Sequence, residues 1–478
     1  MSVDSSVTRR DLLLAGAAGS FVLASSTYRG RAADPPPNII FVMADDLGYA
    51  DLSCYGRRDY STPNVDRIAA DGLRFLQAYA NSAVCSATRT ALITGRYQYR
   101  LPIGLEEPLT SASTRKVGLP PEHPTLPSLL RKAGYGTTLI GKWHLGRLPE
   151  FGPLQSGYDH FYGFRGGALD YYTHKFGPAP SNTDDLWDGD VKIQQNGYLT
   201  DLLGERAVAI VNDYAKSKQP FLLSLHFNAP HWPWEAPGDE AEAQRIKSLF
   251  HFDGGSQETY ARMVMQLDLQ VGRVLQALDT TGLADNTIVV FTSDNGGERF
   301  ADTWPFTGRK TELLEGGLRI PAIVRWPGHV RPGTTNNQVM ISMDWMPTFL
   351  AAAGALPDPS YPLDGVDLLP TLTQNAAAFP RKLYWRYKNN EQEALRDGDW
   401  KYLKIRGNTF LFNVADDPLE RANFKARRKD IYDRLVADYA AWNATMLPFD
   451  PKSSTDGFKA NQLADHFGVE AAGGGPAD

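Results

Sequence analysis

The sequence predicts an α/β fold: a large, mostly parallel or mixed sheet sandwiched by helices, followed by a small antiparallel sheet and a helix. Two observations predict it. From residue 38 on, apolar strand-like runs alternate with helical patterns, which is typical of a mostly parallel sheet covered on both faces. After about residue 375 the pattern changes to short apolar segments separated by turn residues such as Asp397 and Gly398, which is typical of antiparallel strands.

Four strand-like runs end where charged or imidazole side chains begin. The runs cover residues 38–43, 136–140, 220–225 and 287–291. The side chains that follow them are Asp45 and Asp46, Lys142 and His144, His231, and Asp294 and Asn295. In open α/β sheets, ligands bind outside the carboxyl ends of the strands. The four endings therefore predict one convergent site.

Two helices between these runs have recognisable signals. Thr62 and Pro63 predict an N-cap and a first-turn proline for a helix that ends near Gly72. A second helix is predicted by apolar residues at helical spacing, which indicate a face packed in the core. These residues are Tyr260, Val264, Leu267, Val271, Val274, Leu275 and Leu278.

The C-terminal part of the chain divides into three predicted pieces. Short segments at residues 382–387, 394–396, 400–404 and 409–413 predict the small antiparallel sheet, and a helix is expected around residues 430–442. From about residue 451 the chain is polar and rich in glycine, which predicts a flexible tail. We therefore expect a catalytic domain over residues 34–375, an α+β subdomain over 376–450 and a flexible tail over 451–478.

The composition indicates a large globular protein and argues against nucleic acid as a partner. The chain has 478 residues, of which 42% are hydrophobic. With 49 basic and 55 acidic residues the formal net charge is −6, so no general positive field attracts polyanions. Two cysteines, Cys54 and Cys85, exclude a scaffold held by disulfides.

The N-terminus resembles a bacterial twin-arginine export signal. Arg9 and Arg10 precede a short apolar segment rich in glycine and alanine at residues 15–24. This segment is shorter than the roughly 20 residues that span a bilayer, and no later segment is transmembrane in character. We expect residues 1–33 to be a signal peptide read by the twin-arginine export machinery, with a periplasmic or extracellular destination. The alternative is an amphipathic N-terminus that is not cleaved.

Asp45, Asp46, Asp294 and Asn295 offer oxygen-bearing side chains at the ends of two predicted strands. Carboxylates and an amide without clustered cysteine or histidine suit a hard divalent cation, Ca²⁺ or Mg²⁺, better than zinc. Three acidic groups at one place repel one another unless a cation is bound. The alternative for the Asp45 and Asp46 pair alone is a helix cap or a turn.

Cys85 begins a predicted helical turn that closes at Gly95, with Arg89 one turn on and on the same face. The N–H groups at the helix start and the Arg89 guanidinium would both attract an oxyanion bound beside residue 85. The alternative is a buried, inert cysteine. Lys142, His144, His231 and Lys310 would add positive charge and proton-transfer groups, whereas we expect His226, which precedes its strand end, to be structural.

These motifs together resemble the arylsulfatase-like type I sulfatases, which belong to the alkaline phosphatase superfamily. The resemblance covers about residues 38–420 and includes Cys85 and Arg89, since the family's signature is a cysteine followed by x-Pro-x-Arg or x-Ala-x-Arg. The remaining motifs stand in the family's order: Asp45 and Asp46, Lys142 and His144, His231, Asp294 and Asn295, and Lys310 with the glycine-containing segment that follows it.

The resemblance implies a mechanism. A maturase would oxidise Cys85 to formylglycine (3-oxoalanine), whose hydrated form, bound to the cation and helped by Asp294, would attack the sulfur of a sulfate ester. Arg89, Lys142 and Lys310 would hold the sulfate oxygens. His231 would protonate the leaving alcohol, and His144 would take a proton so that sulfate is expelled. Ala87 replaces the usual proline of the signature and Thr88 its common serine, which bears on which maturase converts Cys85.

Two other functions remain open on the sequence. One is a formylglycine-dependent phosphonate or phosphate ester hydrolase, and the other is an exported glycan-binding pseudosulfatase with an unconverted Cys85. As substrate we expect a sulfated carbohydrate in preference to a small aryl sulfate. Six side chains on predicted mouth loops would stack on a sugar ring or pack beneath the loops. They are Tyr171, Tyr172, His174, Trp232, Trp234 and Trp304. If these side chains stack on a sugar ring, we expect Trp234→Ala to weaken glycan turnover and to spare turnover of a small aryl ester.

Overall fold

A large mixed sheet organises the protein, as predicted. The computed structural model describes residues 35–110, 115–176, 183–374 and 376–457, and these contain ten strands of one sheet. Five central strands are parallel to one another, and most of the pairs outside them are antiparallel. In spatial order the strands are β13 (Thr334–Asn336), β2 (Leu73–Phe75), β12 (Ala322–Arg325), β11 (Thr287–Ser293), β1 (Asn38–Ala44), β10 (Phe221–His226), β4 (Gly136–Lys142), β5 (His160–Phe164), β8 (Trp187–Asp188) and β9 (Val191–Lys192).

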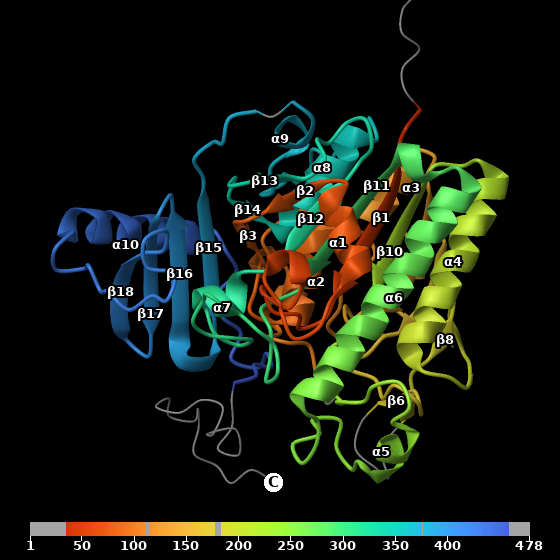
Figure 1. Cartoon of the computed structure of the whole chain (residues 1–478). Helices are drawn as coiled ribbons and strands as arrows, with labels where there is room; N and C mark the ends of the chain where they lie inside the picture. The colour runs from red at the N-terminus through yellow and green to blue at the C-terminus, as the bar shows by residue number, and fades with distance from the viewer. Residues whose placement is uncertain (1–34, 111–114, 177–182, 375, 458–478) are drawn as a thin grey trace, which may run out of the picture. The chain divides into compact units, whose positions relative to one another are not determined.

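Helices cover both faces of this sheet because successive residues of a strand point to opposite sides. In β1, Ile40 and Val42 pack into one core with α1 (Pro63–Ala70), α4 (Leu199–Ser217) and α6 (Gln257–Thr281). Ile39 and Phe41 pack into a second core with α2 (Cys85–Thr94), α3 (Leu126–Lys132) and α8 (Trp345–Ala352). Helices α4 and α6 lie side by side (Figure 1). The predicted two-sided sheet is therefore confirmed.

The remaining short elements lie outside this sheet. The helices are α5 (Glu240–Arg245), α7 (Glu315–Leu318) and α9 (Leu369–Thr373). Two pairs of short strands form separate ladders, β3 (Ala78–Tyr79) with β14 (Met340–Ile341), and β6 (Lys175–Phe176) with β7 (Thr183–Asp184).

Both predicted helices are present, with one correction at a cap. All seven apolar residues of the predicted stripe on α6 are buried, and Ser256 caps this helix by accepting the Thr259 N–H at 3.0 Å. Helix α1 begins at Pro63, but the Thr62 hydroxyl does not cap it. The hydroxyl instead accepts the N–H of Ser53 at 3.0 Å, because the preceding turn folds back onto it.

The C-terminal sheet and its helix are also as predicted. Strands β15 (Lys382–Tyr387), β16 (Gln392–Asp397), β17 (Trp400–Ile405) and β18 (Asn408–Asn413) are antiparallel, and α10 (Lys429–Asn443) packs against β16 and β17 (Figure 1). Trp385 of β15 shares a hydrophobic core with Tyr79 and Val84. In the same interface the Lys401 ammonium lies 3.0 Å from a Glu315 oxygen and 2.9 Å from a Glu420 oxygen, and all three side chains are fully buried.

The chain after residue 450 differs from the predicted flexible tail. Ser454 donates its N–H and hydroxyl to the buried Glu106 carboxylate at 2.8 and 2.7 Å, and Thr455 forms a β-bridge with Glu107. Residues 451–457 are thus held against the body because buried carboxylate and backbone groups need hydrogen-bond partners. The predicted signal peptide at residues 1–33, and the tail beyond 457, lie outside the described residues. Among the described helices, none has the length and apolar character needed to cross a membrane.

Candidate active site

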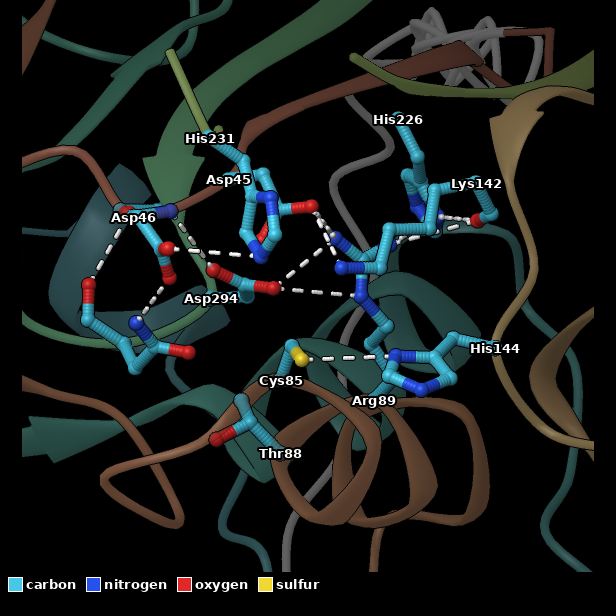
Figure 2. Close-up of polar contacts among 12 residues, drawn as sticks. Asp45, Asp46, Cys85, Thr88, Arg89, Lys142, His144, His226, His231 and Asp294 are labelled. Atoms are coloured by element: carbon cyan, nitrogen blue, oxygen red, sulfur yellow. Dashed lines mark hydrogen bonds and ion pairs between the residues drawn. The ribbon is translucent and has the colours of Figure 1, made fainter. Parts of the chain in front are cut away.

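The carboxyl ends of four neighbouring strands bring the predicted residues together. Strands β11, β1, β10 and β4 are consecutive in the sheet, and each is one of the four runs singled out in the sequence. All ten predicted site residues lie in one group, joined by hydrogen bonds, ion pairs and the close approach of the Cys85, Asp45 and Asp294 ligand atoms. Most of these residues are labelled in Figure 2. They are Asp45, Asp46, Cys85, Arg89, Lys142, His144, His231, Asp294, Asn295 and Lys310.

Three aspartates and an asparagine form a buried acidic cluster. The Asp46 N–H donates to Asp294 at 3.2 Å, and Asn295 Nδ2 donates to Asp46 Oδ1 at 2.8 Å. Asp46 adopts a left-handed backbone conformation with φ of 63°, and its side chain contacts Asn295 just after β11. Ligand atoms of Asp45, Asp294 and Cys85 lie within 4.8 Å of one another, as do those of Asp45, Asp46 and His231.

Two oxygens of this cluster fit a cation. Asp45 Oδ1 and Asn295 Oδ1 are buried and accept no hydrogen bond from any described residue. Buried polar oxygens are normally paired, because desolvation without a partner costs about 1–3 kcal/mol. Oxygen donors of this kind are the ligands that Ca²⁺ and Mg²⁺ prefer. The donor set therefore suits the hard divalent cation predicted from the sequence.

Positive side chains surround the carboxylates. Lys142 Nζ lies 2.5 Å from Asp45, Lys310 Nζ lies 2.7 Å from Asp46, and Arg89 Nη2 lies 2.9 Å from Asp294. Burial, together with the charge of Asp294, raises the pKa of Asp45 to about 8. Burial acts in the same direction on Asp294, but Arg89 and Lys142 outweigh it and hold the pKa of that carboxyl below its usual range. A bound cation would favour the ionised form of Asp45 as well.

Arg89 and Lys142 face the carboxylates. Arg89 stands one turn after Cys85 in α2, as predicted, and its side chain is almost fully buried. Its Nη1 donates to the Lys142 carbonyl at 3.3 Å and lies 3.4 Å from Nδ1 of His226 (Figure 2). Neither Arg89 nor Lys142 lines the pocket over Cys85. His226, expected to be structural, belongs to this layer beneath the site.

A pocket of about 270 Å³ opens over Cys85 and is lined by four of the predicted residues, Cys85, His144, His231 and Lys310. Its other walls were not predicted, apart from Trp232. They include Leu109, Ala168, Phe176, Trp232, Leu249, Phe250 and Asp456. The residues of these walls come from segments far apart in the chain and carry no motif, so no local pattern could have identified them.

The two histidines of the pocket are oriented by backbone carbonyls. His144 Nε2 donates to the Leu109 carbonyl at 2.8 Å, so its Nδ1 is the acceptor that faces the Cys85 thiol at 3.3 Å. His231 Nδ1 donates to the Trp232 carbonyl at 2.7 Å and leaves Nε2 toward Asp46 at 3.5 Å. Burial and neighbouring lysines hold the pKa of both rings well below the usual range, and burial raises the pKa of the Cys85 thiol.

The predicted aromatic contacts need one correction. Trp234 is only 1% exposed and packs against Tyr260 and Phe300, so it does not reach the pocket. Trp234 thus follows the second alternative, packing beneath the loop, and the basis for an effect of Trp234→Ala through ring stacking is absent. Tyr171 and His174 are buried as well, and Trp304 is exposed without lining the pocket. Trp232 is the one member of the six that does line it.

Fold and site together define a hydrolase of the alkaline phosphatase superfamily: a mixed sheet whose central strands lead into carboxylates, histidines and a lysine that gather around residue 85. The chain belongs to the sulfatase family, which it matches over residues 37–355, and residues 308–438 match the C-terminal region of N-sulphoglucosamine sulphohydrolase. It is thus a sulfuric ester hydrolase.

Two named sulfatases and one solved structure resemble most of the chain. Human N-acetylgalactosamine-6-sulfatase is 35% identical over 74% of this chain and 69% of its own length. Human arylsulfatase A is 34% identical over 84% of this chain and 81% of its own length. The solved structure of Ps i-CgsB superposes with a TM-score of 0.79 at 32% identity, covering 91% of this chain and 98% of the other. Ps i-CgsB has also been solved in complex with k-i-k-neocarrahexaose.

Proposed function

We propose that this sulfatase removes sulfate from a sulfated carbohydrate, with formylglycine made from Cys85 and a divalent cation held by Asp45, Asp46, Asp294 and Asn295. The observation that carries the proposal is the position of residue 85. It begins α2 in the floor of the pocket, with ligand atoms of Asp45 and Asp294 within 4.8 Å and a histidine nitrogen at 3.3 Å. The similarity to N-acetylgalactosamine-6-sulfatase, and to Ps i-CgsB, which has been solved with k-i-k-neocarrahexaose, supports a carbohydrate substrate.

The cation would be Ca²⁺ or Mg²⁺, coordinated by the aspartates and Asn295 together with residue 85. When bound, it would act as a Lewis acid that makes a coordinated hydroxyl group easier to ionise. Arg89 and Lys142 keep the Asp294 and Asp45 carboxylates in place from behind. Their charges also favour the ionised form of both carboxylates, which cation binding requires.

Residue 85 supplies the nucleophile after oxidation, and the Cys85 sulfur stands where the hydroxyl groups of the hydrated aldehyde would lie. Such a hydrate offers one hydroxyl to attack sulfur and a second whose deprotonation expels sulfate and restores the aldehyde. His144 is placed to take that second proton, because its Nδ1 faces residue 85 while Nε2 is held by the Leu109 carbonyl. The fixed tautomer leaves Nδ1 free of hydrogen.

His231 and Lys310 act on the ester itself. Protonated at Nε2, His231 would donate to the leaving oxygen, and the bond from Nδ1 to the Trp232 carbonyl fixes the direction of the ring. The low pKa of His231 makes the protonated ring a strong acid, and a bound sulfate would offset the repulsion from Lys310. Lys310 brings a positive charge into the pocket wall, where negative charge changes during sulfuryl transfer.

Maturation and export complete the proposal. A formylglycine-generating maturase that accepts Ala87 in the signature would convert Cys85, and twin-arginine export would carry the folded protein out of the cytoplasm. Residues 34–375 would form the catalytic domain and 376–450 the C-terminal α+β subdomain, with their shared core at Trp385 and Tyr79.

Peptide mass spectrometry across residue 85, on protein co-expressed with such a maturase, tests the proposal together with turnover. The substrates are 4-nitrophenyl sulfate, N-acetylgalactosamine 6-sulfate and carrageenan hexasaccharide. We expect a formylglycine mass and sulfate release from at least one sugar, both abolished in Cys85→Ala and both retained in Cys54→Ala, which removes the other cysteine. Turnover by unconverted protein refutes the role of residue 85. Converted protein that cleaves only phosphonate or phosphate esters, or that binds glycans without cleaving them, refutes the proposed reaction.

A further inference from the structure

We propose that Trp232 and Phe250 form an aromatic wall on the leaving-group side of the pocket, which stacks against the sugar ring that carries the sulfate. The inference rests on the proposed function and names the residues that select its substrate. Both rings line the same pocket as Cys85, His231 and Lys310. The wall is therefore continuous with the catalytic groups.

The order of the contacts gives the wall a direction. The Trp232 ring centroid lies 4.0 Å from that of His231 and 4.5 Å from that of Phe250, and Phe250 stacks on Phe252 at 5.5 Å. The aromatic surface thus runs outward from His231. Because His231 is placed to protonate the leaving oxygen, the carbon skeleton attached to that oxygen lies beside Trp232 and Phe250.

Lys310 defines the other end of the wall. Its ammonium lies 5.9 Å from the centroid of the Trp232 ring, on the side of the acidic cluster, where it pairs with Asp46. A sulfate group is drawn to this cation. An apolar ring face is drawn to the aromatic surface. A sulfated sugar satisfies both ends at once, since it carries an anionic group on a ring with apolar C–H faces.

The outer rings are held in place by a buried histidine between them. Phe250 and Phe252 are each 38% exposed, whereas His251 is 1% exposed. His251 Nδ1 accepts the backbone N–H of Trp234 at 3.1 Å, and its Nε2 donates to Glu242 at 2.7 Å. The His251 carbonyl also accepts a hydrogen bond from Arg299 at 3.2 Å.

This anchor explains why two phenylalanines point outward. Three hydrogen bonds fix the backbone and the ring of His251, so its neighbours on both sides are directed away from the core. Large apolar side chains ordinarily gain stability by burial, so aromatic rings held at a pocket by a rigid anchor are typical of ligand contacts. His251 is in this sense a positioning residue for Phe250.

Phe250→Ala tests the wall on the converted, cation-loaded enzyme. With N-acetylgalactosamine 6-sulfate and carrageenan hexasaccharide as probes, we expect KM to rise about three- to tenfold for the sugar that the enzyme hydrolyses, with kcat changed by less than about twofold. Inhibition by inorganic sulfate, which needs only the cationic end, stays unchanged. Phe250→Tyr keeps the ring and restores KM. Phe449→Ala is the matched control, because Phe449 is also exposed, at 41%, and packs on Arg386 away from the pocket.

Other results overturn the inference. Unchanged KM for the sugar in Phe250→Ala, or an equal weakening of inhibition by inorganic sulfate, shows that Phe250 does not contact the ring. A wild-type enzyme that hydrolyses 4-nitrophenyl sulfate but neither hydrolyses nor binds the two sugar probes also refutes the wall, while the sulfatase reaction stands. Failure to hydrolyse any sulfate ester despite conversion of Cys85 refutes the proposed function instead.

Discussion

Asn295→Ala should remove most of the stabilisation that a divalent cation gives to the fold. Asn295 Oδ1 is buried without a hydrogen-bond partner among the described residues, although its Nδ2 donates to Asp46 at 2.8 Å and to the Gly296 carbonyl at 2.9 Å. Such an oxygen is explained if it is a cation ligand. The substitution deletes this ligand and leaves the three carboxylates in place.

The size of the effect follows from linkage. A cation at one hundred times its dissociation constant stabilises the folded state by about 2.7 kcal/mol. Removing a group that only supports the metal ligands weakens affinity by about 10- to 100-fold, so we expect at least about a 100-fold loss when the ligand itself is removed. A loss of about 100-fold reduces the stabilisation at the same cation concentration to about 0.4 kcal/mol. With an unfolding entropy of about 2.1 cal/mol/K per residue and about 400 folded residues, the cation raises Tm by about 3 °C in the wild type and by about 0.5 °C in the variant.

The assay is thermal unfolding in chelator and in a series of Ca²⁺ and Mg²⁺ concentrations. The measured quantity is the increment in Tm on adding the cation, because Asn295→Ala also loses two hydrogen bonds worth about 1 kcal/mol each and lowers Tm without the cation. Asn38→Ala is the matched control: Asn38 is buried at the other end of β1, where it donates to Thr287 at 3.3 Å, and its variant should keep the full increment. An equal increment in Asn295→Ala and wild type would refute the reasoning.

Three further outcomes are expected. Lys310→Ala should lower kcat/KM for 4-nitrophenyl sulfate by about 100- to 1000-fold, and an unchanged value would exclude Lys310 from the sulfate site. Burial raises the pKa of Glu107 to about 8, against about 4.3 in the unfolded chain, so this carboxyl costs stability as the pH rises from about 4.5 to 8. In urea unfolding, the free energy of unfolding should fall less between pH 5 and pH 8 in Glu107→Gln than in the wild type. Equal falls in the two proteins would contradict the raised pKa of Glu107. Lys401→Met should cost about 3–5 kcal/mol because it removes the ion pair of the buried Glu420 carboxylate, which then lies beside Glu315 without a compensating charge. Lys404→Met, at a partly exposed pair, should cost less than about 1 kcal/mol, and similar losses of unfolding free energy in urea would show that burial does not decide the difference.

The reacting groups could be predicted from the sequence because strand order and helical spacing fix their positions. Asp45 and Asp294 follow neighbouring parallel strands, and the carboxyl ends of such strands meet at one edge. Cys85 and Arg89 are one helical turn apart, which places them on one face whatever surrounds the helix. What could not be read was the direction of the Arg89 side chain. The Arg89 guanidinium bonds to Asp294 and does not line the pocket, and its partner is 205 positions away in the chain.

The loops were predicted less well, and for a different reason. Trp232 and Trp234 stand two residues apart in one proline-rich loop, yet one lines the pocket and the other is 1% exposed against Tyr260 and Phe300. Nothing in the local sequence distinguishes them, because the difference depends on helix α6 and on the segment after β11, which come later in the chain.

The difference between strand ends and loops also bears on which residues carry out the reaction and which select the substrate. Apart from Lys310, which lies between β11 and α7, the catalytic side chains follow strand ends or begin a helix, where backbone geometry leaves little freedom to move them. The pocket walls come from the segments that contain Leu109, Phe250 and Asp456, which the fold brings together from three distant parts of the chain. These segments contain neither Cys85 nor His231, so a change of a single side chain in them acts first on the wall. The residues that select the sugar are therefore expected on these loops, and Phe250 is the one whose removal should change KM while leaving the chemistry of residue 85 intact.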